Sequence, residues 1–87
     1  MINESQIIPG GLKMRDVEVN KVPVELYKIL KFEGLVQSGA EAKAVIAEGQ
    51  VLLNGVVETQ KRKKIVADDI IEFGAEKLHV VFKEEQL

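Results

Sequence analysis

The residues with the clearest chemical potential form a run of four cations, Lys61-Arg62-Lys63-Lys64. Positive side chains this close together repel one another unless anions relieve the repulsion. A phosphate backbone supplies such anions, so the run predicts either a nucleic-acid contact or a solvated basic loop. Lys28 and Lys31 stand three residues apart, which is the spacing of neighbours on one face of a helix, and Lys43 lies in a separate segment. A surface that combined all these cations would be larger than the run itself.

A second candidate anion site is the segment Ser38-Gly39-Ala40-Glu41, which has the Ser-x-x-Glu pattern of a capping box. In this arrangement both polar side chains satisfy backbone N–H groups at the start of a helix. The helix dipole and the remaining N–H groups attract anions, and Gly39 leaves the backbone open to close approach. Capping alone explains the pattern, and a bound phosphate is compatible with it.

Residues that could support catalysis are few and isolated. His79 falls in a strand-like segment without a second histidine or any cysteine, so it indicates a structural histidine rather than a general base. Asp68-Asp69 could hold a cation, although adjacent carboxylates in a polar segment are typical of turns. No glycine pair continues into the lysine and hydroxyl pattern of a phosphate-binding loop. We expect no catalytic residue, no metal site and no cofactor.

Two helices must position the cations. The first is expected to have Pro23 in its first turn and to end at Gly34, and the second runs from the capping box to Gly49. We expect Phe32 to lie in the core rather than to stack on a base. The apolar face of the first helix consists of Leu26, Ile29, Leu30 and Phe32, and that of the second of Ala42, Val45 and Ile46.

The remaining elements are strands. Asn54-Gly55 separates two β-prone runs, which is a strong signal for a tight hairpin because both turn positions need positive φ. The sequence therefore predicts an α+β fold in which two packed helices lie against a small, mainly antiparallel sheet. The other expected strands span residues 14–19, 64–66, 70–73 and 78–82.

Length and composition restrict the class of protein. The chain has 87 residues, which suits one domain, and no cysteine, which excludes disulfides and thiolate metal sites and favours the cytoplasm. No long apolar run or export signal is present, so we expect no membrane association. Residues 1–12 are expected to form a flexible N-terminal arm, and residues 13–87 a single domain.

Charge is distributed unevenly along the chain. The net charge of −2 combines about +3 over residues 13–64 with about −4 over residues 65–87. The basic middle favours a polyanionic partner, whereas the acidic C-terminal segment leaves open a protein-interaction or assembly module that engages a basic partner.

Three segments together resemble the RNA-binding domain named after ribosomal protein S-four, also called the αL motif. They are Leu30 to Gly34, Ser38 to Lys43, and Ile46 to Gly55, and Lys64 to Ile71 resembles the segment that follows in that family. The similarity is greatest to small stand-alone bacterial proteins of the YbcJ-like branch. It differs in two places: Gly39 replaces an arginine found in many members, and Asp68 replaces the usual glycine.

The resemblance implies a non-enzymatic module that binds structured RNA, with ribosomal or transfer RNA as the expected ligand and a ribosome-associated role. It places the RNA on the two helices and the loop after the hairpin, with no known protein partner. The expected RNA-binding residues are Lys28, Lys31, Ser38, Gly39, Lys43, Lys61, Arg62, Lys63 and Lys64.

Overall fold

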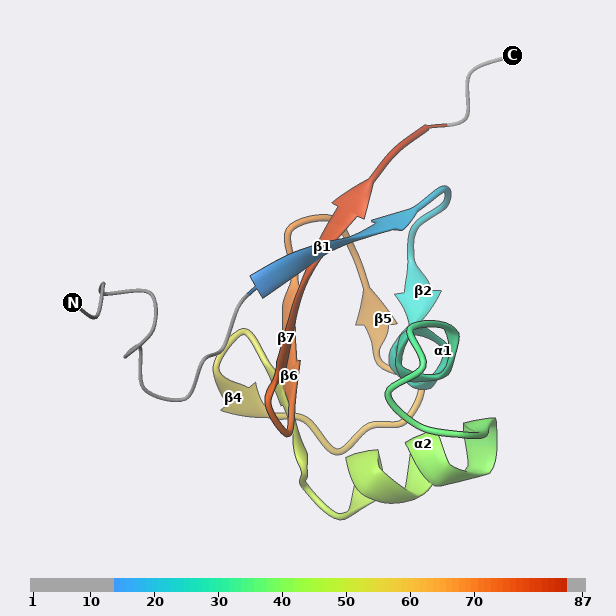
Figure 1. Ribbon diagram of the computed structural model, residues 1–87, viewed down its shortest axis with the longest axis vertical. Helices are drawn as coiled ribbons and strands as arrows, with labels where there is room; N and C mark the ends of the chain where they lie inside the picture. The colour runs from blue at the N-terminus through green and yellow to red at the C-terminus, as the bar shows by residue number, and fades with distance from the viewer. Residues whose placement is uncertain (1–13, 85–87) are drawn as a thin grey trace, which may run out of the picture.

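The structure is a computed structural model that describes residues 14–84, in which two helices pack against a sheet (Figure 1). The arm predicted for residues 1–12 lies outside the described residues. The elements in chain order are β1 (Met14–Val19), β2 (Val24–Glu25), α1 (Leu26–Phe32), α2 (Gly39–Ala47), β3 (Val51–Leu53), β4 (Val56–Val57), β5 (Lys64–Ile65), β6 (Ile70–Phe73) and β7 (Glu76–Phe82).

Five of the strands form one sheet in the order β1-β7-β6-β3-β4. The contacts between β7, β6, β3 and β4 are antiparallel, whereas β1 pairs with β7 in parallel. A separate antiparallel pair is formed by β2 and β5, which links the entry of α1 to the basic run. The predicted α+β fold with a mainly antiparallel sheet is confirmed.

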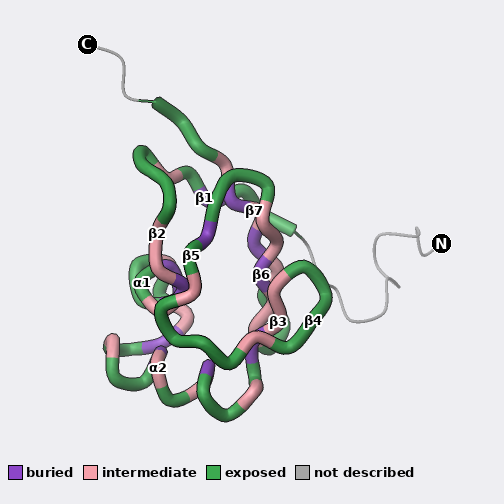
Figure 2. Tube along the Cα trace, turned by 180° about the vertical axis from the view of Figure 1, so that it is seen from behind, coloured by how far each residue is buried: buried purple, intermediate pink, exposed green. Residues whose placement is uncertain are grey.

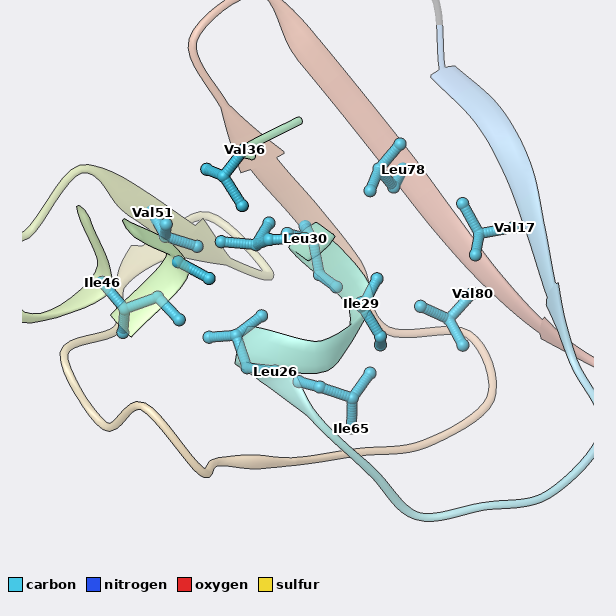
Figure 3. Packing of buried hydrophobic residues seen from close by; sticks show 12 residues of the cluster. Val17, Leu26, Ile29, Leu30, Val36, Ile46, Val51, Ile65, Leu78 and Val80 are labelled. Carbon is cyan, nitrogen blue, oxygen red and sulfur yellow. The ribbon is translucent and has the colours of Figure 1, made fainter. Parts of the chain in front are cut away.

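The core lies between the helices and one face of the sheet. Along β7, the buried Leu78 and Val80 alternate with half-buried residues, so this strand turns one face inward. Figure 2 shows that the buried positions lie on the inner side of the elements, and Figure 3 shows Ile29 and Leu30 of α1 projecting toward the sheet. Close packing of these aliphatic side chains is the main stabilising contribution.

Phe32 was expected in this core, and that expectation is wrong. The side chain is 69% exposed, whereas Leu26, Ile29 and Leu30 are buried. With 3.6 residues per turn, a residue two positions after Leu30 lies about 200° further round the helix. Phe32 therefore points away from the face that Leu26 and Leu30 bury.

The start of α1 also differs from the prediction. Pro23 was expected in the first helical turn, but the helix begins at Leu26, and Val24 and Glu25 are extended and paired with Ile65 and Lys64 of β5. Pairing with a strand distant in sequence therefore overrides the local preference of proline for a helix start. This pairing fixes where the first helix meets the basic run.

Both helices end at the predicted glycines. Gly34 and Gly49 have φ of 73° and 80°, a conformation that costs glycine little because it has no Cβ. After each glycine the chain turns back on the helix: the Leu35 N–H donates to the Leu30 carbonyl at 3.0 Å, and the Gln50 N–H to the Val45 carbonyl at 3.1 Å. These bonds satisfy carbonyls that the helices leave without partners.

The capping box at α2 is present with one alteration. The Glu41 N–H donates to Ser38 Oγ at 3.0 Å, as predicted. Oε1 of Glu41 accepts from the N–H of Gln37 at 2.7 Å, one residue earlier than the usual partner. The two side chains therefore fix both the helix start and the chain that leads into it.

The Asn-Gly hairpin between β3 and β4 is confirmed, with φ of 52° at Asn54 and 86° at Gly55. The amide of Asn54 also reaches the loop before β6: Nδ2 donates to Asp69 Oδ1 at 3.0 Å, and Oδ1 accepts from the Ile70 N–H at 2.9 Å. Asp69 Oδ2 accepts from the Val66 N–H at 2.9 Å. Asp69 is thus a turn residue that connects the hairpin to the segment after the basic run.

Replacement of Ser38 by alanine is expected to lower the free energy of unfolding by about 1 kcal/mol, because the Glu41 N–H loses its acceptor. Urea denaturation followed by circular dichroism measures the change. Ser38→Asp retains a side-chain acceptor and should restore most of the stability. Equal stability of the alanine and parent proteins would contradict the proposed role of the cap.

Replacement of Gly55 by valine should lower the free energy of unfolding by about 1–3 kcal/mol, since a β-branched residue is strained at positive φ. Ala75→Val is the matched control, because Ala75 is exposed in the turn between β6 and β7 and is not at positive φ. Thermal denaturation of both variants tests the difference. A loss of the same size in the control would show that added bulk, rather than the backbone conformation, is responsible.

Candidate nucleic-acid interface

The basic run is fixed to the start of α1 by backbone hydrogen bonds. The Leu26 N–H donates to the Lys63 carbonyl at 2.9 Å, and the Tyr27 N–H to the Lys61 carbonyl at 3.1 Å. These bonds satisfy two of the N–H groups that the first turn leaves without helical partners. The loop carbonyls therefore occupy the helix start, while the side chains of Lys61 and Arg62 remain exposed.

The side chain of Tyr27 lies at the centre of three cations. The ring centroid is 4.7 Å from Nζ of Lys43, 5.4 Å from Cζ of Arg62 and 6.0 Å from Nζ of Lys28. The electron-rich face of an aromatic ring attracts cations at such distances. Tyr27 therefore gathers charges from α1, α2 and the basic run, and we call these four residues the Tyr27 cluster.

One carboxylate stands beside this cluster. Glu25 lies 3.4 Å from Nζ of Lys28 and 3.5 Å from Nη1 of Arg62, and its side chain is 18% exposed. Burial raises the pKa of Glu25, but the hydrogen bond from Lys28 and the charges of Lys28 and Arg62 outweigh that effect and leave the pKa below its ordinary value. Glu25 remains ionised and orients two cations, while the cluster as a whole stays positive.

The start of α2 touches the same cluster. A Cβ placed on Gly39 would lie 3.7 Å from Cε2 of Tyr27, which is ordinary van der Waals contact. Ser38, the residue before it, is exposed and already serves as the helix cap. The predicted residues that the structure brings together are Lys28, Gly39, Lys43 and Arg62, with Ser38 next to them.

The other predicted residues surround the cluster rather than belong to it. Lys31 and Lys61 are exposed, Lys63 is half-buried, and Lys64 lies in β5 opposite Glu25. Within residues 14–84, none of these four lysines forms an ion pair. Their charges are therefore available to an external anion.

Sequence reasoning missed Tyr27 and Glu25 as members of the site. Tyr27 follows Leu26 in a segment whose apolar spacing indicates a helix that faces the core. Glu25 stands directly before Leu26, the first residue of the expected apolar face. The available signal was an aromatic residue with a polar tip directly before Lys28. Its convergence with Lys43 and Arg62 depends on tertiary packing, which spacing alone does not give.

His79 lies on the face of β7 that points away from the core, between the buried Leu78 and Val80, and has polar partners there. Nδ1 lies 3.1 Å from Asp16 Oδ1 on β1, and Nε2 lies 3.0 Å from Asp68 Oδ1 in the loop before β6. The hydrogen bonds to Asp68 and Asp16 raise the pKa of His79 above its ordinary value. With both ring nitrogens engaged, His79 joins β1, β7 and the loop.

Neither a group of metal ligands nor a membrane-spanning helix is found in the described part of the chain. Among residues 14–84 no three histidine or acidic side chains are grouped so that they could hold a metal ion. None of the helices described there is long and apolar enough to cross a membrane.

Comparison with known proteins adds to this geometry. The model of the S4 domain family matches residues 17–81, which include both helices, all of β2 to β6, and parts of β1 and β7. The chain belongs to the S4 domain family. The family assignment agrees with the resemblance seen in the sequence.

Relatives of this S4 domain include YbcJ of Escherichia coli (strain K12) and YbcJ of Shigella flexneri. Each is 53% identical over 58 residues, which cover 67% of this chain and 83% of the relative. The solution structure of E. coli YbcJ, which reveals an αL motif involved in RNA binding, has a TM-score of 0.62 and 48% identity over 79% of this chain and 89% of that one. The 30S ribosomal protein S4e from Thermoplasma acidophilum shares the fold, with a TM-score of 0.58 and 24% identity over 76% of this chain and 39% of that one.

The two departures of this S4 domain from the family pattern have local explanations. Gly39, which replaces a frequent arginine, lies against Tyr27, so the cations of the Tyr27 cluster stand beside that position. Asp68, which replaces the usual glycine, has a φ of 73° and uses its carboxylate to bind His79. The turn therefore keeps a backbone conformation that glycine adopts easily.

The pKa of His79 is expected to fall toward its ordinary value in an Asp68→Asn variant, because a charged acceptor becomes neutral. Titration by NMR of the single histidine measures this shift, and Glu72→Gln on the neighbouring strand is the control. Because the folded-state pKa is raised, His79 adds its full stability below about pH 6.5 and loses it as the pH rises through the folded-state value. An unchanged pKa in Asp68→Asn would contradict the assigned hydrogen bond.

Proposed function

We propose that this S4 domain binds structured RNA without changing it chemically, and that the Tyr27 cluster is the centre of the contact. The observation that supports this most is the convergence of Lys28, Lys43 and Arg62 on one aromatic ring beside the start of α2. Cations that come from three separate segments form a surface suited to several phosphates rather than to one small anion.

The surrounding lysines extend this surface. Lys31 on α1 and Lys61, Lys63 and Lys64 after the hairpin supply charges without ion-pair partners among the described residues. Lysine ammonium groups act as point charges toward phosphate, which fixes position but carries no base sequence. Selection would therefore depend on RNA shape, and ribosomal or transfer RNA in the cytoplasm is the ligand class that we propose.

The relatives support the same proposal. E. coli YbcJ carries an αL motif involved in RNA binding, and its structure aligns with most of this chain. The family match over residues 17–81 contains α1, α2 and the basic run, which are the parts of the chain that hold the Tyr27 cluster. A shared motif and a local concentration of charge thus point to the same surface.

The alternative, a protein-interaction module that uses the acidic C-terminal segment, has less structural support. Asp68 binds His79, Asp69 binds Asn54 and the Val66 N–H, and Glu76 lies 3.6 Å from Arg15. Half of the six acidic residues in that segment therefore have partners inside the domain. These contacts account for much of the acidic charge without an external basic protein.

Lys43→Ala and Arg62→Ala should each reduce the slope of log affinity for RNA against log salt concentration by about 0.7–0.9, if each residue contacts one phosphate. Filter-binding titrations with a folded transfer RNA over a series of salt concentrations measure the slope. In the double variant this slope should fall by about 1.4–1.8, because the two contacts release separate counterions.

The matched control is Lys77→Ala, which removes a lysine from β7 that has no contact with the Tyr27 cluster. It should leave the slope unchanged. If the double variant is folded and binds the RNA with the parent's affinity and slope, the Tyr27 cluster is not the RNA contact. Equal losses in Lys77→Ala and Lys43→Ala would indicate diffuse attraction instead of a site.

A further inference from the structure

Two exposed phenylalanines line one groove at the side of α1. Phe32, in the last turn of α1, is 69% exposed, and Phe82, at the end of β7, is 39% exposed. The groove runs between α1 and β2 on one side and the ends of β1 and β7 on the other. Large aromatic side chains exposed around a concave surface are typical of a contact site.

The rest of the lining is suited to a flat aromatic ligand. Val17, Val19, Val24 and Ile29 add apolar side chains from three elements. These aliphatic groups give the groove an apolar floor, while the phenylalanine rings offer faces on which another ring can stack. The described structure gives Phe32 no place in the core, so its exposure is unexplained by folding.

The groove also joins the proposed RNA surface. Lys28 and Lys64, which belong to the predicted RNA-binding residues, line it, and Lys21 and Lys83 add two further cations. The lining also holds four carboxylates. Glu25 is paired with Lys28 and Arg62, and Glu33 with Arg15 at 2.8 Å, whereas Glu18 and Glu84 have no ion-pair partner among the described residues. Lys21, Lys64 and Lys83 have no ion-pair partner within residues 14–84.

We propose that this groove receives an unpaired base of the bound RNA, which stacks on Phe32 while its flanking phosphates contact Lys28 and Lys64. The inference rests on the proposed function and adds a ligand class to it: structured RNA with a bulged or terminal unpaired nucleotide. Aromatic side chains next to cations are the combination that binds unstacked bases, since any base has a π-face and carries a phosphate. An apolar protein segment would use the aromatic rings but not the lysines.

The test compares two RNA probes: a short blunt duplex, and the same duplex with one bulged 2-aminopurine nucleotide. The parent protein should bind the bulged duplex more tightly and change the fluorescence of the 2-aminopurine. Phe32→Ala should reduce affinity for the bulged duplex by about 5- to 150-fold, the range expected for loss of base–aromatic stacking, and leave affinity for the blunt duplex unchanged. Phe32→Tyr keeps the ring and should retain the preference.

Val56→Ala is the matched control, because Val56 is also 69% exposed but lies on β4, outside the groove lining. It should preserve both affinities. If the parent binds both duplexes equally, or Phe32→Ala keeps the preference for the bulge, the groove is not a base site, while the proposed RNA function stands. Binding of neither duplex nor transfer RNA would overturn both proposals. Self-association of the parent that Phe32→Ala abolishes, with no bulge preference, would identify the groove as a contact between copies.

Discussion

The two backbone hydrogen bonds between the basic run and the first turn of α1 are the constraint on which the candidate site depends. They place Arg62 next to Tyr27 and the run next to the entry of the helix. The β2–β5 pair reinforces this connection on the other side of the loop. Mutually repelling cations are thus held together by contacts of the main chain, whose hydrogen bonds are independent of side-chain charge.

The arrangement also assigns separate tasks to neighbouring residues. Glu25 orients Lys28 and Arg62, and the ring of Tyr27 attracts the cations of Lys43 and Arg62, so the long side chains have less freedom to lose when they bind. The start of α2 meets the ring at Gly39, where an added Cβ would be in ordinary van der Waals contact with the ring. Orientation therefore comes from uncharged or acidic groups, whereas attraction for anions comes from the lysines and Arg62.

Sequence reasoning located the elements whose signals are local. The capping box, the Asn-Gly turn and the glycines after both helices depend on a few adjacent residues, and the structure contains all of them. It failed at Pro23, because pairing with β5 keeps the next two residues extended. It also failed at Phe32, because the position of this residue around α1 directs its side chain away from the core. The cations of the candidate site were recognisable by type, but their arrangement around Tyr27 is set by contacts between segments far apart in the chain. Residues 1–13, with the predicted arm, lie outside the described structure.

The parallel pairing of β1 with β7 has a consequence for how the domain folds. These strands are the first and last of the described elements, so all six register pairs join residues more than sixty positions apart. Closing such a long loop is slow compared with forming the α1–α2 pair or the hairpin. During synthesis from the N-terminus, β1 emerges well before its partner and has no hydrogen-bonded neighbour until β7 follows. The helices and the basic run can therefore assemble early, whereas the sheet is completed only when the last strand is available.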